Sequence, residues 1–77
     1  IMKATSKLIL QIISKSLNIP SKSLKDKTNL NTFEEWDSLG VLTVMSAIDK
    51  KFKGKVNINS FEKIKNVNDI VKIINKK

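Results

Sequence analysis

A serine between an aspartate and a leucine, Asp37-Ser38-Leu39, stands where a polar stretch gives way to a helical pattern. Asp37 is a residue type that caps helices, because its carboxylate accepts the free amide hydrogens of the first turn. Ser38 is therefore expected in the exposed first turn, with its hydroxyl near the positive end of the helix dipole. That position favours attachment of an anion such as a phosphate. An isolated triplet of this kind more often only caps a helix, so the surrounding sequence decides between the two interpretations.

The residues that follow the serine repeat with the period of an α-helix. Apolar side chains recur at spacings that place them on one helical face, namely Val41, Val44, Met45, Ile48 and Phe52. The pattern predicts a helix from about Ser38 to Phe52. Leu39 and Leu42 lie off this stripe and close to Ser38, so they are either partly buried packing residues or a small apolar docking spot. Gly40 is unfavourable there, by on the order of 1 kcal/mol relative to Ala in a helix interior and less near an end.

Two further helices are predicted on either side of this one. The first spans roughly Ala4–Leu17; Asn18 tolerates the left-handed conformation that ends helices, and Pro20 prevents continuation. The last spans Val67–Asn75 and is capped by Asn66. Their apolar stripes are Ile9, Ile12, Ile13 and Leu17 in the first helix, and Val67, Ile70, Val71 and Ile74 in the last.

The connecting segments complete an all-α prediction. Ile19–Glu35 is a long loop, and such loops are uncommon in compact domains unless they are pinned or functional. Its apolar residues Leu24, Leu30 and Phe33 are expected to pin it over the helix ends. Trp36 either closes this loop onto the bundle or meets a partner. Val56–Asn59 is predicted as loop and Ser60–Ile64 as one short helical turn. We therefore expect a small four-helix bundle, three main helices plus one short one, as a single domain over residues 1–77.

Composition restricts the chemistry available to these 77 residues. The chain contains neither cysteine nor histidine, so it has no disulfide, no thiolate or imidazole metal site and none of the usual nucleophile–base pairs. We expect no catalytic residues and no bound metal. No apolar run approaches the ~18 residues needed to span a membrane. The run Leu8-Ile9-Leu10 is too short for a signal sequence. The expectation is a cytoplasmic protein.

The charge is unevenly distributed. All 15 basic residues are lysine, and the net charge is +8. Residues 1–31 carry a net charge of +5, residues 32–49 carry −4 with no lysine, and residues 50–77 carry +7. Ser38 therefore lies in the one acidic segment of a basic chain. A nucleic-acid-binding protein would more naturally place lysines on the helix that docks, so no nucleic-acid partner is expected.

The same elements resemble acyl carrier proteins, the family whose Asp-Ser-Leu serine carries 4′-phosphopantetheine. The resemblance runs from about Ile9 to Ile74, in the same order of helices and loops. Its matching pieces are "SLNIP", "DKTNL", "EEWDSLG", "IDKKF" and "FEKIKNVNDIVKII". The combination is specific to the family, although Asp-Ser-Leu alone is not. The resemblance implies an acyl-carrier-like bundle with a long first loop.

The resemblance also implies a mechanism. A phosphopantetheinyl transferase would move the arm from coenzyme A, with Mg²⁺, to the Oγ of Ser38, where Asp37, Leu39 and Leu42 would flank the recognition site. The arm's thiol would hold acyl groups as thioesters for acyl-loading, acyl-modifying or acyl-transfer enzymes. The bundle would shelter the acyl chain among Val44, Ile48, Val56, Phe61, Ile64 and Ile70. A monomeric carrier that does no catalysis itself is expected.

Departures from the family pattern concern charge. Gly40, Thr43, Lys50 and Lys51 stand where many relatives have acidic residues that meet basic patches on synthase partners. A dedicated lipid, polyketide-like or surface-polysaccharide-linked pathway is therefore favoured over general fatty acid synthesis. An aminoacyl or peptidyl carrier has the same fold and attachment chemistry. A small basic nucleic-acid-binding domain, and an interaction module that lost the arm, are the alternatives from other classes.

Overall fold

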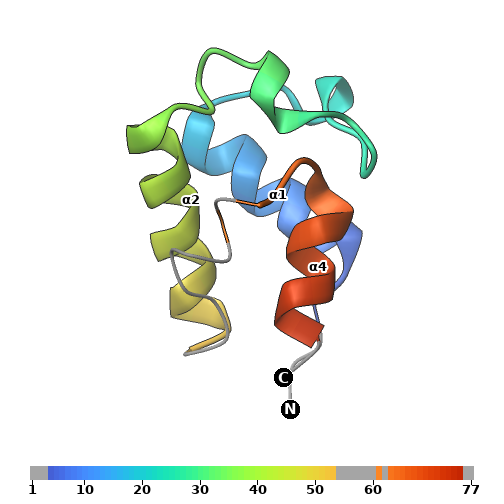
Figure 1. Ribbon diagram of the computed structural model, residues 1–77, viewed down its shortest axis with the longest axis vertical. Helices are drawn as coiled ribbons and strands as arrows, with labels where there is room; N and C mark the ends of the chain where they lie inside the picture. The colour runs from blue at the N-terminus through green and yellow to red at the C-terminus, as the bar shows by residue number, and fades with distance from the viewer. Residues whose placement is uncertain (1–3, 54–60, 62, 76–77) are drawn as a thin grey trace.

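The computed structural model describes residues 4–53, 61 and 63–75, and its regular elements are all helical within these ranges. The α-helices are α1 (Ser6–Leu17), α2 (Ser38–Lys51) and α4 (Val67–Asn75), and two 3₁₀ turns, η1 (Ser21–Ser23) and η2 (Leu30–Thr32), lie between α1 and α2. Figure 1 shows α1 between α2 and α4, with the long first loop across the top. The all-α, acyl-carrier-like prediction is confirmed. None of the described helices is long and apolar enough to cross a membrane.

The ends of α1 are set by local hydrogen bonds. The hydroxyl of Thr5 accepts a hydrogen bond from the Leu8 amide at 3.2 Å, so the helix begins at Ser6 rather than at the predicted Ala4. Asn18 adopts the left-handed conformation at φ 56° and ψ 40°, as predicted for a residue that ends a helix. Its side chain tolerates this region better than most, which explains the stop before Pro20.

The last helix starts with reciprocal capping. The Asn66 side-chain oxygen accepts a hydrogen bond from the Asp69 amide at 3.0 Å, while a carboxylate oxygen of Asp69 accepts from the Asn66 amide at 3.2 Å. Two free amides of the first turn are satisfied in this way. The predicted bounds Val67–Asn75 and the capping role of Asn66 are therefore confirmed.

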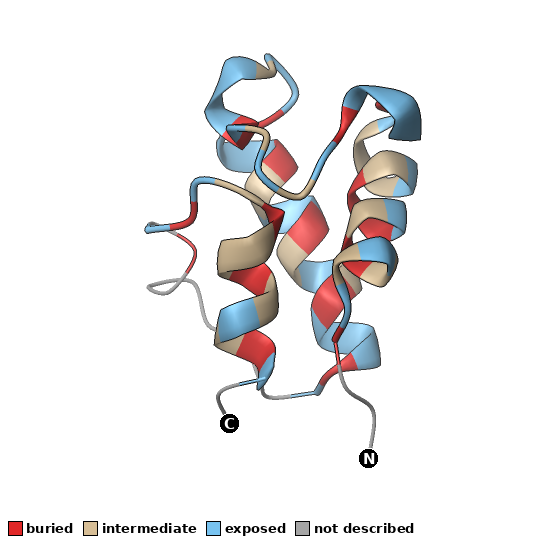
Figure 2. Ribbon diagram, turned by 90° about the vertical axis from the view of Figure 1, so that its right-hand side faces the viewer, coloured by how far each residue is buried: buried red, intermediate tan, exposed pale blue. Residues whose placement is uncertain are grey.

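Facing stripes of apolar residues form the core. Figure 2 shows the buried residues on the sides of the helices that face one another. α1 packs against both α2 and α4, which makes it the central helix. The side chains that are fully or almost fully enclosed are Ile9, Ile13, Leu30, Val44, Ile48, Val67 and Ile70. Burial of these side chains stabilises the fold by roughly 1.5–3 kcal/mol each relative to exposure.

The long loop is held by both side chains and main chain. Leu24 and Leu30 are buried, as predicted, while Phe33 is only half-buried. The Leu30 amide donates a hydrogen bond to the Lys65 carbonyl oxygen at 2.7 Å, and the Asn68 amide donates to the Asp26 carbonyl oxygen at 3.2 Å. The loop is thus tied to the start of α4, which fixes the path by which the chain reaches α2.

The two ends of the described chain are also joined. The Asn75 side chain accepts a hydrogen bond from the Ala4 amide at 2.9 Å and donates one to the Ala4 carbonyl oxygen at 2.9 Å. This paired contact holds the segment before α1 against the end of α4.

Two predicted segments fall outside the residues that the structure describes. The loop predicted at 56–59 lies wholly outside them, and the short turn predicted at 60–64 lies partly outside them.

Candidate functional site

Asp37 and Ser38 occupy the positions that the sequence predicted. Asp37 is the N-cap of α2, and its carboxylate accepts a hydrogen bond from the Gly40 amide at 2.8 Å. Ser38 is the first residue of α2 and is exposed to solvent. Its hydroxyl therefore lies at the positive end of a 14-residue helix, where an anion is stabilised by the helix dipole and by free amide hydrogens.

Gly40 differs from its sequence-based expectation. Glycine is unfavourable by helix propensity in the first turn, but the structure requires it there. Gly40 is buried, and a Cβ added at this position would collide with the carbonyl oxygen of Glu35 and lie 3.3 Å from a methyl carbon of Leu17. The loop before α2 thus folds back over the first turn so closely that only glycine fits. This contact fixes the direction in which α2 leaves the loop, and with it the position of Ser38.

An open surface hollow begins at the serine. Its volume is about 580 Å³, and its walls are Asn31, Trp36, Asp37, Ser38, Val41, Leu42, Phe61 and Ile64. Most of these side chains are apolar, and they come from the long loop, from α2 and from the segment before α4. The structure thus brings residues from three parts of the chain around one exposed hydroxyl.

The hollow contains only part of the predicted acyl pocket. Phe61 and Ile64, two of the residues that the resemblance assigns to an acyl pocket, line the hollow. Val44, Ile48 and Ile70 do not; they are completely buried in the core beneath it. Val56 lies outside the described residues.

The two leucines near Ser38 point mainly into solvent. Leu39 is 74% exposed and Leu42 is 45% exposed, so neither is a packing residue of the core. Leu42 also forms part of the hollow's wall, whereas Leu39 does not. Of the two interpretations of these residues, an apolar docking spot beside the serine fits their exposure better.

Sequence reasoning missed three walls of the hollow. From the sequence, Trp36 is expected to close the loop or meet a partner, Val41 belongs to the buried stripe, and Asn31 has no expected role. Trp36 is buried, as a closure requires, yet one side of it faces the hollow. Val41 follows Ser38 by three residues, and that helical spacing would have placed both on one side of α2.

Comparison with known families identifies this arrangement. The sequence pattern of the family described as "Phosphopantetheine attachment site" matches residues 7–74, which include α1 from its second residue, the long loop, α2 and all but the last residue of α4. The chain belongs to this family. Its prosthetic group is 4′-phosphopantetheine, and the family is one of carrier domains, in agreement with an acyl carrier protein. No curated protein matches the chain.

The residues present at the start of α2 fit such a group. Phosphopantetheine is joined through a phosphate to an alcohol, and an exposed serine hydroxyl stands at a helix N-terminus beside an open, largely apolar hollow. Within the described part of the chain, no cluster of three or more acidic, histidine or cysteine side chains could hold a metal ion. Glu34, Glu35 and Asp37 are exposed beside the serine, so the approach to it is acidic.

Proposed function

We propose that Ser38 is the attachment point of the phosphopantetheine arm and that residues 1–77 act as one acyl carrier domain. The observation that supports this most directly is the exposure of Ser38 as the first residue of α2, capped by Asp37 and open to the hollow. A first-turn serine with no further role needs neither an adjacent apolar hollow nor an exposed leucine beside it. The family match supplies the chemistry that this arrangement can serve.

In the proposed attachment step, the Oγ of Ser38 attacks the phosphorus that bears the pantetheine part of coenzyme A. A bond forms between Oγ and this phosphorus, the pyrophosphate bond breaks, and 3′,5′-ADP leaves. In this step the hydroxyl proton is lost to a base of the transferase. The new phosphodiester is an anion at the N-terminus of α2, where the helix dipole stabilises it.

The attached arm supplies a thiol on which acyl groups are carried as thioesters. The residues around Ser38 then have two tasks. Trp36, Val41, Phe61 and Ile64 offer an apolar surface to the first part of the cargo. A longer acyl chain would pass between Phe61 and Ile64 toward the core. There it would have to displace side chains that are completely buried in the core, namely Val44, Ile48 and Ile70. We therefore propose that short and medium chains are sheltered more readily than long ones.

The proposed partners follow from the carrier role. They are a phosphopantetheinyl transferase and enzymes that load, modify or transfer the acyl group, and the chain itself contributes no catalytic group. We place it in the cytoplasm, in a dedicated lipid, polyketide-like or surface-polysaccharide-linked pathway. Lysines at the end of α2, where relatives commonly carry acidic residues, support a pathway other than general fatty acid synthesis.

Intact-mass measurement after coexpression with a broad-specificity phosphopantetheinyl transferase tests the assignment. We expect the parent protein to gain one phosphopantetheine group and Ser38→Ala to gain none. Ser23→Ala is the control, because Ser23 is an exposed serine in η1 of the long loop, and it should be modified as fully as the parent. Ser38→Ala should unfold within about 1 kcal/mol of the parent, since Asp37 provides the cap. Modification of Ser38→Ala would refute the assignment.

A further inference from the structure

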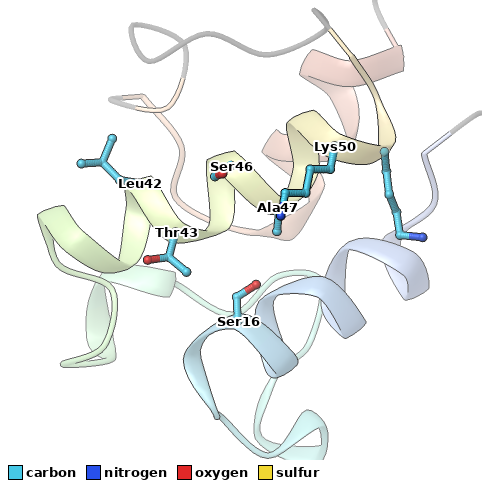
Figure 3. Close-up of a pocket in the computed structure, with 7 residues that line it drawn as sticks. Ser16, Leu42, Thr43, Ser46, Ala47 and Lys50 are labelled. Carbon is cyan, nitrogen blue, oxygen red and sulfur yellow. The ribbon is translucent and has the colours of Figure 1, made fainter.

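A second open hollow lies on the other side of α2, between that helix and the end of α1. Its volume is about 730 Å³, and its walls are Ser16, Leu42, Thr43, Ser46, Ala47, Lys50 and Lys51. We refer to it as the α1–α2 groove. Figure 3 shows Ser16 of α1 facing the α2 residues that form the opposite wall. Leu42 belongs to both hollows, so the groove starts where the hollow at Ser38 ends.

The chemistry changes along the groove in one direction. Leu42 is the wall residue nearest to Ser38, Thr43 and Ser46 follow along α2, and Lys50 and Lys51 come from the last turn of the helix. Ser46 and both lysines are exposed. Among the residues that the structure describes, no acidic side chain belongs to the walls of the groove. The groove is therefore cationic at one end and neutral along the rest of its length.

The other end of α2 has the opposite charge. Glu34, Glu35 and Asp37 are exposed just before the helix. Lys50 follows Ser38 by twelve residues, and a rise of 1.5 Å per residue separates them by about 18 Å along the helix axis. α2 thus has an acidic pole at the serine and a basic pole about 18 Å away along its axis. A surface with two opposite poles fixes the orientation of a partner as well as attracting it.

We propose that the α1–α2 groove receives an acidic patch on an acyl-handling partner protein. The proposal rests on the carrier function of Ser38, which requires an enzyme to approach this end of the molecule. The partner's surface is expected to carry carboxylates that meet Lys50 and Lys51. These carboxylates would lie about 18 Å from the opening of the partner that admits the arm. Basic residues beside that opening would face the acidic pole. This arrangement is the reverse of one in which a basic patch on the partner meets an acidic helix of the carrier.

A charge-swap experiment on protein association tests the groove directly. The probe is a ketosynthase that accepts acyl carrier proteins through a basic patch. It is used in two forms: the unchanged enzyme is the basic form, and the enzyme with the lysines and arginines of that patch replaced by glutamate is the acidic form. Association rates with the unloaded chain are measured at low and high salt for the parent and for the double variant Lys50→Glu, Lys51→Glu. The control is Lys63→Glu, Lys72→Glu, which makes the same change of charge at exposed lysines in a separate surface hollow.

We expect the parent to associate about tenfold faster with the acidic form of the probe than with the basic form, because complementary charge acts mainly on encounter. The Lys50→Glu, Lys51→Glu variant should reverse this preference, and the control variant should keep it. High salt should remove most of the difference, since exposed charges are screened over a few ångströms at about 1 M. A substrate carried on free pantetheine shows whether each form of the probe remains active.

Several outcomes would overturn the proposal. One is an equal association rate with both forms of the probe, and another is no association with the acidic form. A third is a control variant that changes the association rates as much as Lys50→Glu, Lys51→Glu does, which would mean that net charge alone governs association. A homodimer that dissociates in the Lys50→Glu, Lys51→Glu variant would make a second copy of the chain the occupant instead. The assay uses the unloaded chain, so it is independent of Ser38. A chain that gains no phosphopantetheine but shows the charge swap would refute the proposed function and leave the groove as a docking site for an acidic protein surface.

Discussion

Replacing Gly40 by alanine tests whether the loop before α2 really closes on the first turn of the helix. Helix propensity alone predicts a gain, because alanine is more favourable than glycine by up to about 1 kcal/mol. The structure predicts a loss. The new Cβ would overlap the carbonyl oxygen of Glu35 and lie 3.1 Å from the carbon of that carbonyl. These are main-chain atoms, which cannot rotate away as the end of a flexible side chain does.

The magnitude follows from two opposing terms. Inserting an extra carbon into a closely packed site costs roughly 1–3 kcal/mol, and the overlap with main chain places this site near the upper end of that range. Subtracting about 1 kcal/mol of helix propensity leaves a net loss of about 2 kcal/mol. For a domain of this size, such a loss lowers the melting temperature by roughly 8–16 °C. It would be a substantial part of the roughly 5–15 kcal/mol that separates folded from unfolded protein.

Urea unfolding of Gly40→Ala and the parent, followed by circular dichroism, measures this difference. Ser46→Ala is the control, because Ser46 is exposed on the same helix and its replacement should be neutral or slightly stabilising. We also expect slower modification of Gly40→Ala by the transferase, since the loop must move away from the helix start that presents Ser38. A Gly40→Ala protein as stable as the parent, or more stable, would show that the approach of Glu35 does not require glycine.

Two other predictions concern the chain ends and the cargo. Asn75→Ala should destabilise the protein by about 1–3 kcal/mol in urea unfolding, because both hydrogen bonds to the Ala4 main chain are lost, whereas Lys72→Ala on the same helix should have little effect. Ile64→Ala should lose about 2–5 kcal/mol in the unloaded protein, since Ile64 is buried, and it should enlarge the hollow beside Ser38. In proteins loaded with saturated acyl chains, the melting temperature should rise with chain length, and Ile64→Ala should extend that rise to longer chains. A melting temperature independent of chain length in the parent would contradict the sheltering of cargo.

Local features of the fold were predictable because local interactions cause them. The start of α2 at Ser38 and the start of α4 at Val67 were predicted correctly, since Asp37 and Asn66 cap these helices through bonds to residues three positions away. The buried stripes follow from helical periodicity in the same way. The errors at helix ends are also local. Thr5 caps α1, so that the helix begins slightly later than its periodicity suggests, and Phe52 is the residue after α2 rather than its last.

The candidate site was only partly predictable for the same reason. The spacing of Asp37, Ser38 and Leu42 along one helix is sufficient to place them close together. That Trp36 faces the hollow depends on how the long loop turns back, through contacts between residues far apart in the sequence, such as the bond from Leu30 to Lys65. No short pattern in the sequence encodes such a contact.

The sequence alone determined the helices, their capping residues, the exposed serine at the start of α2 and the uneven charge, because each depends on residue type and on spacing within a few positions. The tertiary structure alone decided three other features: the requirement for glycine at Gly40, the hollow that opens at Ser38, and the groove in which Ser16 of α1 faces the lysine-bearing side of α2. Each of these depends on how closely two segments approach in space. That distance is set by the packing of the whole bundle, so no single segment contains it.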